Sequence, residues 1–329
     1  MLLIVNKLST CEKINFLYTS KINEEYIYYL FFDEQIRYNT IANSTYRNRY
    51  RNILLDINDF LKCDINNNCG YVTNIDKYIL NNVTHLTFRN SFNKYLKECL
   101  PNTITHLTFG FSFNKNIKAR IPNSVTHLTF GHKFNKKILN SIPNSVTHLT
   151  FGVNFNQNIK NCIPNSVLHL TLGALFNYTI TDCLPESLIY LKFGWAFNQN
   201  IENSIPPNLK YLIFGFKFNQ NITNSIPSHV KYLSFGHNFN QNITNCLPNT
   251  ITHLIFGTSF NQNITNCLPN SVTHLIFGDN FNQNITNCIP NSVTNLTIGY
   301  RFNYNITLPN SVINFINNSQ YYLCIKYSN

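Results

Sequence analysis

The chain has 329 residues, of which 43% are hydrophobic and 14% aromatic, so it holds enough apolar side chains for a large core. The N-terminal run Leu2–Val5 is too short for a signal peptide, and no stretch reaches transmembrane length, so we expect a cytosolic protein without membrane contact. The net charge of +11 is uneven, because residues 1–80 hold nine basic and nine acidic side chains, whereas the remainder holds 16 basic and five acidic ones.

The first segment, residues 1–79, is not repetitive and is predicted to cap the domain that follows. Ser9 and Glu12 fit a capping box at a helix start, and Ile14 and Leu17 follow at helical spacing, so residues 1–22 predict a short helix. Residues 23–79 contain aromatic clusters without a clean period. Within them, residues 53–61 fit a strand or a helix equally well.

Residues 80–310 repeat one pattern at a constant spacing. Prolines keep this spacing from Pro101 to Pro290 and glycines from Gly110 to Gly299, and a Phe-Asn pair keeps it from Phe92 to Phe302. The period, about 21 residues, lies within the range of about 20 to 50 residues that is typical of stacked repeat proteins. We therefore expect eleven stacked repeats, here called coils.

Each coil contains one pattern of alternating burial. In the segment from His127 to Gly131, Leu128 and Phe130 are predicted to point inward, and His127 and Thr129 outward. Turns are expected at Pro122 before this strand and at Gly131 after it. A single coil cannot bury its apolar side chains, so neighbouring coils must cover them. The predicted fold is a repeat solenoid with one parallel β-strand per coil and few helices.

The repeat unit resembles the FNIP repeat, a short relative of the leucine-rich repeat. The similarity is carried by Phe134-Asn135, by Ile138 three residues later, by Ile142-Pro-Asn-Ser-Val146, and by His127-Leu-Thr-Phe-Gly131. The Asn lies two residues later than in the general leucine-rich signature. The resemblance implies a solenoid similar to leucine-rich repeats that binds a protein partner.

Residues 8–21 resemble the second half of an F-box, which in its family docks onto the adaptor subunit of SCF ubiquitin ligases and can precede FNIP arrays. The usual first helix of that motif is missing, and only Met1–Lys7 stand in its place. The resemblance implies docking through Ile14, Phe16 and Leu17 and a role as substrate-recognition subunit. The alternatives are a helix that only caps the array, in a scaffold without a ligase link.

The far end of the array is atypical. Its last link is shortened, to Asn305–Pro309, and Phe315 replaces the repeated Leu. Residues 321–327 are predicted to be a closing strand, because an uncovered end of a sheet invites aggregation. We assign residues 311–329 to a C-terminal cap.

Stacking turns each repeat position into a column of side chains. Six cysteines share a column with serines, which indicates a small, tight position and not a disulfide framework. The Asn of Phe-Asn is expected to hydrogen-bond its own coil and the next. A column of His, interrupted by Tyr, predicts mostly neutral imidazoles with lowered pKa values, since stacked charges would repel. Metal binding is not expected, because parallel imidazoles lack carboxylate or thiolate partners.

The two positions after each repeat Gly vary most between coils and follow the strand, at the rim where solenoids bind partners. In the middle coils aromatic and basic side chains gather there, as binding hot spots require. Random drift among repeats is the alternative explanation. The predicted partner-binding residues are Tyr190, Lys192, Trp195, Tyr211, Phe216, Lys217, Tyr232 and His237.

A second feature is a basic patch on the first four coils, where Lys94, Lys115 and Lys136 share a column. It indicates a solubilising face or, as the alternative, a surface for nucleic acid. No sequence motif of an enzyme is present, and a regular array lacks a deep pocket. We therefore expect a monomeric binding protein without cofactor or metal, whose partner is a protein.

Overall fold

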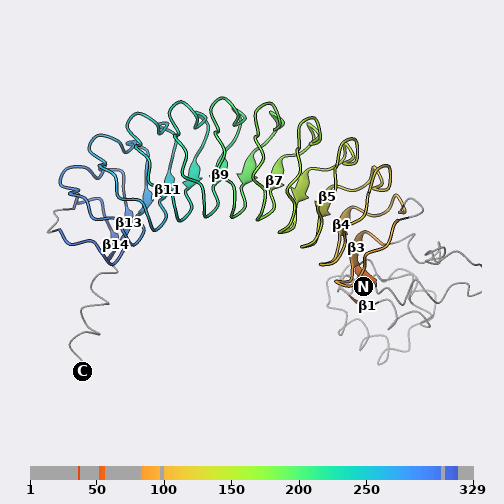
Figure 1. Cartoon of the computed structure of the whole chain (residues 1–329). Helices are drawn as coiled ribbons and strands as arrows, with labels where there is room; N and C mark the ends of the chain where they lie inside the picture. The colour runs from red at the N-terminus through yellow and green to blue at the C-terminus, as the bar shows by residue number, and fades with distance from the viewer. Residues whose placement is uncertain (1–35, 38–51, 56–82, 97–99, 305–307, 318–329) are drawn as a thin grey trace, which may run out of the picture. The chain divides into compact units, whose positions relative to one another are not determined.

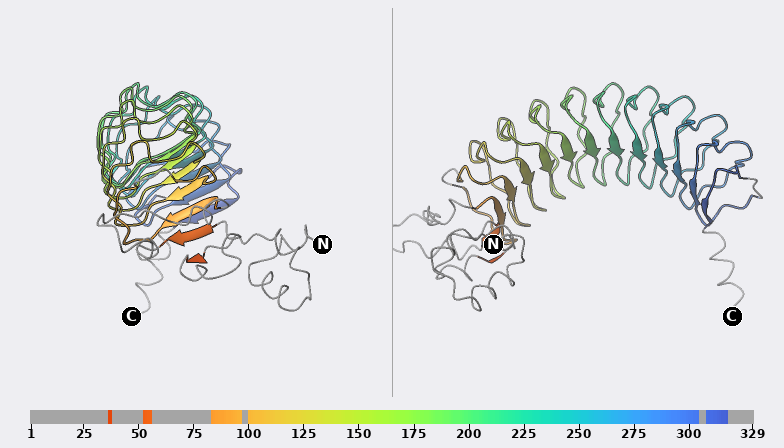
Figure 2. Two further views of the ribbon diagram at one scale, coloured as in Figure 1. Left: turned by 90° about the vertical axis from the view of Figure 1, so that its right-hand side faces the viewer. Right: turned by 180° about the vertical axis from the view of Figure 1, so that it is seen from behind.

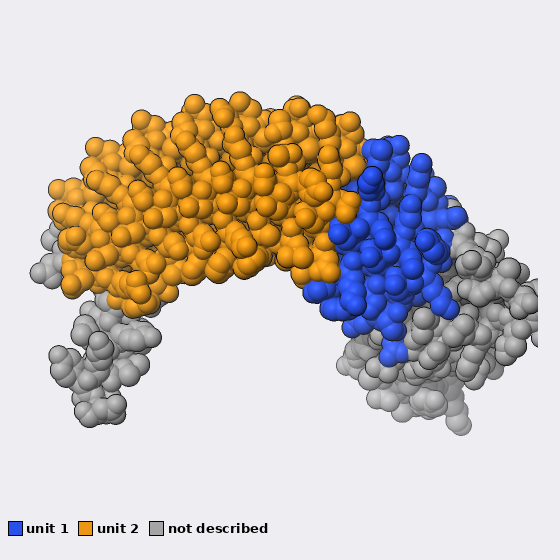
Figure 3. Space-filling model, viewed as in Figure 1, with its two compact units in different colours: residues 1–146 blue, residues 147–329 orange. Residues whose placement is uncertain are grey.

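The computed structural model describes residues 36–37, 52–55, 83–96, 100–304 and 308–317. They form a parallel β-solenoid, as predicted, and contain no helix, so none of them makes a helix that could cross a membrane. Two compact units divide the chain, Met1–Val146 and Thr147–Asn329 (Figure 3). The predicted N-terminal helix and the predicted strand 321–327 lie outside the described residues.

The described residues of unit 1 form five strands, which pair in parallel with their sequence neighbours (Figure 1). They are β1 (Ile36–Arg37), β2 (Asn52–Leu55), β3 (His85–Phe88), β4 (His106–Thr108) and β5 (His127–Thr129). The register advances by one full repeat per strand from β3 onward, as in His85↔His106. For residues 53–61, the sequence left strand and helix open; residues 53–55 belong to strand β2, and the rest of the segment lies outside the described residues.

Unit 2 continues the same pattern with nine strands, which lie one behind another along one side of the coils (Figure 2). They are β6 (His148–Thr150), β7 (His169–Thr171), β8 (Tyr190–Lys192), β9 (Tyr211–Ile213), β10 (Tyr232–Ser234), β11 (His253–Ile255), β12 (His274–Ile276), β13 (Asn295–Ile298) and β14 (Asn314–Asn317). The last pairing, Asn295↔Asn314, has a shorter step than the others because the link before it is short.

The core is a set of columns that run through the coils. Leu128 and Phe130 are buried, and Phe134 and Ile138 later in the same coil are fully buried, whereas His127 and Thr129 are partly exposed. Phe130 and Phe134 stack within the coil with ring centroids 4.0 Å apart. The predicted alternation is confirmed, and each coil depends on its neighbours to cover its rings.

Three tight turns close each coil. The backbone N–H groups of Phe134, Ser141 and Val146 donate to the carbonyl groups of Gly131, Ile138 and Pro143, at 3.2, 3.0 and 3.1 Å. The turns expected at proline and glycine are therefore present. The remaining turn, which follows the repeat Ile and ends at Ser141 in this coil, contains a residue with φ between 51° and 57°.

That position holds Asn or Asp in eight of the nine described residues with positive φ, and Ala119 in the ninth. Asn and Asp tolerate this left-handed conformation better than other residues with a side chain. The repeat glycine has a different reason, because a Cβ on Gly236 would run into the backbone carbonyl of Gly215 in the preceding coil.

The Asn of Phe-Asn forms the ladder predicted from the sequence. Asn219 Oδ1 accepts a hydrogen bond from the backbone N–H of Asn240 at 2.9 Å, and a second one at 2.9 Å from Gln241 Nε2. The same Oδ1-to-backbone bond recurs from Asn93 to Asn303 in the pairs that the structure describes. The side chain thus ties each coil to the next.

Unit 2 curves with the outward side of its strands on the inside of the bend. Stacked His rings outside the strand are 4.3 Å apart, as between His253 and His274. Core rings at Phe256 and Phe277 are 5.5 Å apart, and those further from the strand, Phe260 and Phe281, are 6.1 Å apart. Because spacing grows from the strand side outward, the outward strand face of unit 2 is concave (Figure 1).

Candidate partner-binding surface

The outward face of six strands, β3 to β6, β11 and β12, carries a Thr-His pair. In β12, the hydroxyl of Thr273 donates to the carbonyl of Thr252 at 3.1 Å and lies 2.9 Å from His274 Nδ1. Since the hydroxyl proton goes to the carbonyl, Nδ1 carries its own proton and donates to the hydroxyl oxygen. His274 Nε2 then accepts from the amide of Asn295 at 2.9 Å.

The His column was expected to have lowered pKa values, and the pKa of one member, His253, is lowered. Burial lowers the pKa of His253, and the neighbouring His274 lowers it further. Both causes act against the charged imidazole. Within the described residues, no three His, Cys, Asp or Glu side chains converge in a way that could hold a metal ion.

Strands β8 to β10 replace this arrangement. Tyr takes the His position, and Lys takes the Thr position in two of the three coils, as Lys210-Tyr211 and Lys231-Tyr232. The three Tyr rings form a tilted column with centroids 6.3 and 6.2 Å apart. Tyr211 is 45% exposed. Burial raises the pKa of the Tyr190 phenol, with a smaller contribution from Tyr232, so this hydroxyl keeps its proton.

A second column lies at the rim of the same coils. Trp195 stacks on Phe216 with centroids 5.4 Å apart, and Phe216 stacks on His237 at 4.3 Å. Lys217 Nζ lies 4.4 Å from the centroid of the Trp195 ring. Trp195 is 46% and Phe216 38% exposed, which is high for aromatic side chains of this size.

The rim is held by backbone hydrogen bonds between successive coils. The N–H of Lys217 donates to the carbonyl of Trp195 at 2.9 Å, and the N–H of Asn238 donates to the carbonyl of Phe216 at 2.9 Å. The exposed rings therefore stand on an ordered backbone. A surface that is fixed before binding loses less entropy when a partner arrives.

The structure brings together the eight residues predicted for partner binding, and we call this set the aromatic patch. Tyr190, Tyr211 and Tyr232 form one column, and Trp195, Phe216 and His237 form the other. Lys217 covers a ring face of Trp195, and Lys192 is exposed on β8. The residues predicted to dock a ligase adaptor, Ile14, Phe16 and Leu17, lie outside the described residues.

Unit 1 has a related feature that the sequence reasoning did not single out. Phe111 stacks on His132 at 4.4 Å and Lys133 Nζ lies 5.7 Å from the centroid of the Phe111 ring. The signal was available, because the three residues occupy the variable positions after the repeat Gly. Within the basic patch, Lys115 Nζ lies 5.2 Å from the centroid of the Tyr95 ring.

The cysteine column is structural, as expected from its exchange with serine. Cys246 Sγ lies 3.2 Å from the carbonyl of Thr244, and Ser225 Oγ makes the same contact with Thr223 at 3.0 Å. Burial raises the pKa of the Cys162 thiol, and neighbouring Cys183 raises it further. A protonated, buried thiol is a poor nucleophile, so Cys162 is not suited to act as a reactive group.

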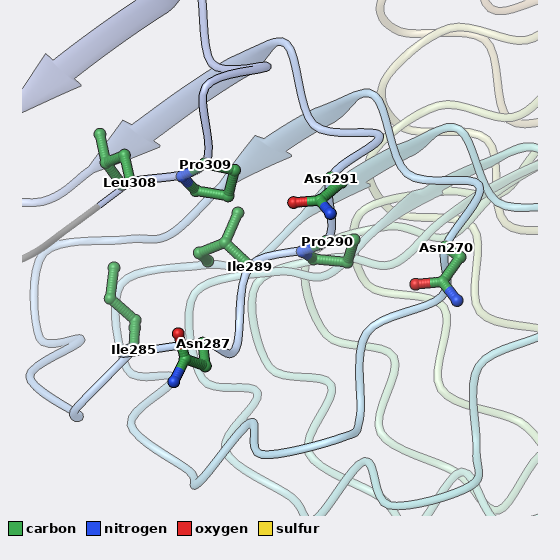
Figure 4. Close-up of a pocket in the computed structure, with 8 residues that line it drawn as sticks. All are labelled: Asn270, Ile285, Asn287, Ile289, Pro290, Asn291, Leu308 and Pro309. Carbon is green, nitrogen blue, oxygen red and sulfur yellow. The ribbon is translucent and has the colours of Figure 1, made fainter.

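One hollow opens in unit 2 where the array changes step. Figure 4 shows it between the Pro290 turn and Pro309, with Ile285 and Ile289 beside it. It lies next to the shortened last link, and its lining includes Asn side chains but no charged group. Nothing in its chemistry indicates catalysis, because no acid, base or nucleophile lines it.

Comparison with known proteins agrees with this architecture. The model of the FNIP repeat matches residues 75–112, 113–154, 134–175, 176–217, 218–259, 260–300 and 281–316. Among solved structures, the chain is similar to the crystal structure of CroV588, described as a novel circular LRR protein, with 43% sequence identity and a TM-score of 0.69. The similarity covers 82% of this chain and 43% of that one, so the chain spans less than half of its length.

Among curated proteins there is no significant match. The repeat matches run from residue 75 to residue 316 and thus include the whole of the predicted array. With its stacked coils of constant length, its Phe-Asn ladder and its single parallel strand per coil, the chain belongs to the FNIP repeat family.

Proposed function

We propose that this solenoid is a protein-interaction scaffold that holds its partner on the aromatic patch. The observation that carries the proposal is the exposed Trp195–Phe216–His237 stack, which stands on a hydrogen-bonded rim in coils whose buried columns match those of their neighbours. Ordered aromatic side chains next to Lys are the composition of binding hot spots.

The polar side chains on the described strands are engaged within the array. Their hydroxyl and imidazole groups face neighbouring coils in ladders, as Thr273 and His274 do, and the open hollow at Pro290 lacks charged groups. A binding role needs only a fixed surface, which a stacked array supplies.

Partner capture from a cell extract, followed by peptide identification, tests the proposal. Trp195→Ala and Tyr211→Ala should each abolish or strongly reduce the recovery of the same partner, because hot-spot truncation typically costs about 2 kcal/mol or more. Phe111→Ala is the matched control, since Phe111 is 41% exposed in the same rim column. Equal recovery with all variants would show that the partner binds elsewhere.

A finer version of this function is substrate recognition for an SCF-type ubiquitin ligase, in the cytosol. Its support is the F-box-like string at residues 8–21, together with free thiols among the described cysteines, which suit a reducing compartment. The full chain should then co-purify with the ligase adaptor, and Phe16→Ala with Leu17→Ala should prevent this. If the adaptor never co-purifies, the scaffold without a ligase link is favoured.

A second candidate is binding of a polyanion to the basic patch in unit 1. It is supported by Lys115 and Lys133, which lie against the exposed rings of Tyr95 and Phe111. Retention on a polyanion column should then fall steeply with salt, because binding to phosphates releases counterions. Alanine at Lys115, Lys118 and Lys136 should abolish it, and retention that ignores these changes rules it out.

A further inference from the structure

We infer that the aromatic patch recognises an acidic protein segment with one apolar anchor residue. This inference rests on the proposed function and names the chemistry of its partner. Four exposed lysines, Lys192, Lys210, Lys217 and Lys231, lie within the same three coils as the exposed rings.

The orientation of the rings carries the first step. Trp195, Phe216 and His237 stack along the array with interplanar angles of 22° and 3°, so their faces are turned toward adjacent coils. Their exposed parts are therefore mainly ring edges. An aromatic ring is electrically negative on its face and positive on its edge, so a row of edges favours carboxylates over cations.

The charges around the rings also favour a partner with carboxylates. Lys210 and Lys231 directly precede Tyr211 and Tyr232, where the coils with His have a neutral residue, Thr in all but one and Leu168 in the other. The change from Thr-His to Lys-Tyr thus adds positive charge where it removes the ladder of imidazoles.

The remaining charges of these coils do not cancel this effect. The two carboxylates, Glu186 and Glu202, are located in turns before and after β8, and the four exposed lysines outnumber them. The phenol of Tyr190 keeps its proton because burial raises its pKa, so it can donate a hydrogen bond to a carboxylate.

An apolar anchor is expected from the exposed surface of the rim. Leu175 is 45% and Trp195 46% exposed in neighbouring coils. Ala174, which corresponds to Trp195 in the preceding coil, is small and leaves room beside the indole. One aliphatic or aromatic side chain of the partner would cover this surface. Burial of such an anchor among ordered rings provides affinity, whereas the charges provide selectivity.

The same geometry disfavours a single-stranded nucleic acid at this place. Such ligands bind by stacking bases on open ring faces. Here Phe216 and Lys217 lie over a face of Trp195, and His237 covers a face of Phe216. A protein segment can bind the ring edges and place one anchor beside the indole, so it does not need a run of open ring faces.

The chain contains one Trp, which makes Trp195 an internal reporter of its own surface. Three Trp-free peptides are titrated into the full chain while Trp195 emission is followed: glutamates with a central leucine, glutamates with a central glycine, and lysines with a central leucine. The first should give a saturable change and the second should bind about tenfold more weakly, the loss expected for a missing apolar anchor. The third should give none.

Variants of the chain test whether the lysines are needed for binding while the protein stays folded. Lys210→Gln with Lys217→Gln should weaken binding of the acidic leucine peptide at least about tenfold and reduce its dependence on salt. Lys136→Gln is the matched control, because it removes one charge at a column where later coils have Gln, and it should change nothing. Circular dichroism of each variant confirms that it is folded.

The inference is overturned if the lysine peptide binds as well as the acidic one, if a single-stranded oligonucleotide binds as tightly as either, or if no peptide gives a saturable change. The proposed function fails differently, through partner capture that survives Trp195→Ala. Capture that needs Trp195 but is unaffected by the two lysine substitutions would keep the scaffold function and reject the acidic partner.

Discussion

The coils of β9 and β11 are alike inside and different outside. Leu212, Phe214, Phe218 and Ile222 in the first correspond to Leu254, Phe256, Phe260 and Ile264 in the second, and all eight are buried. Outside, Lys210-Tyr211 stands where the other coil has Thr252-His253. The inward columns and the turns specify the fold, so the outward columns are free to vary with the partner. Four predictions sharpen this comparison or break it.

The largest effect is expected inside the coil. Phe218→Ala should lower the free energy of unfolding by about 3–5 kcal/mol, because it removes a fully buried ring and leaves a cavity. Phe260→Ala should cost the same, whereas Trp195→Ala at the rim should cost much less. Urea denaturation followed by circular dichroism measures all three. The idea that the inside specifies the fold and the outside varies would be contradicted if the stability losses at Phe218 and Phe260 differed from each other as much as they differ from the loss at Trp195.

The next effect concerns the ladder of Asn side chains that joins successive coils. Asn219→Ala should cost about 1–3 kcal/mol, because it leaves the backbone N–H of Asn240 and the amide of Gln241 without their shared acceptor. Gln241→Ala is the control, since it removes a donor and leaves the backbone bond intact. If both variants lost the same stability, the backbone contact would not be the important one.

A smaller effect, in the opposite direction, is expected in unit 1. Ala119 has φ 56° where corresponding residues are Asn or Asp, so Ala119→Asn should stabilise the protein by about 1 kcal/mol. The reverse change, Asn140→Ala, should destabilise it by a similar amount. Thermal melting of both variants compares them directly, and a loss of stability in Ala119→Asn would show that the turn selects its residue for another reason.

The smallest effect depends on pH. Because the pKa of His253 is lowered on folding, the unfolded chain takes up this proton at a higher pH than the folded chain. Stability from this group is therefore complete above the unfolded pKa of about 6.5 and is lost as pH falls below it.

Melting temperature should accordingly be lower at pH 5 than at pH 7.5, and His253→Asn should reduce that difference. Asn is the suitable replacement because Asn295 already occupies the column next to His274. An equal or higher melting temperature at pH 5 in the parent protein would refute the neutral ladder of imidazoles.

Much of this surface could be predicted from the sequence, because one spacing repeated many times tells which residues must align. Tyr190 and Tyr211 are separated by one repeat, as are Trp195 and Phe216, and the rings of each pair are neighbours, tilted in the first pair and stacked in the second. The unpredicted parts concern geometry within one coil. No spacing reveals that Asn140 adopts a left-handed conformation, or that Gln241 shares an acceptor with a backbone N–H.

The roles of the many Asn residues were likewise not predictable from the sequence. As a composition it resembles a coding bias, yet Asn219 joins two coils, Asn242 Oδ1 accepts from the N–H of Thr244 to shape a turn, and Asn224 occupies the position with positive φ. The recurrent Asn-Ile-Thr triplets are such turns.

The sequence by itself determined that coils of one constant length stack, which side chains face inward, and which columns exist, since periodicity and burial are properties of the pattern. Only the tertiary structure decided which ring faces are covered and which edges remain open, where Lys217 rests, and that the strand face of unit 2 is concave. Those features depend on distances between neighbouring coils, and a linear pattern carries the order of contacts but not their spacing or angles.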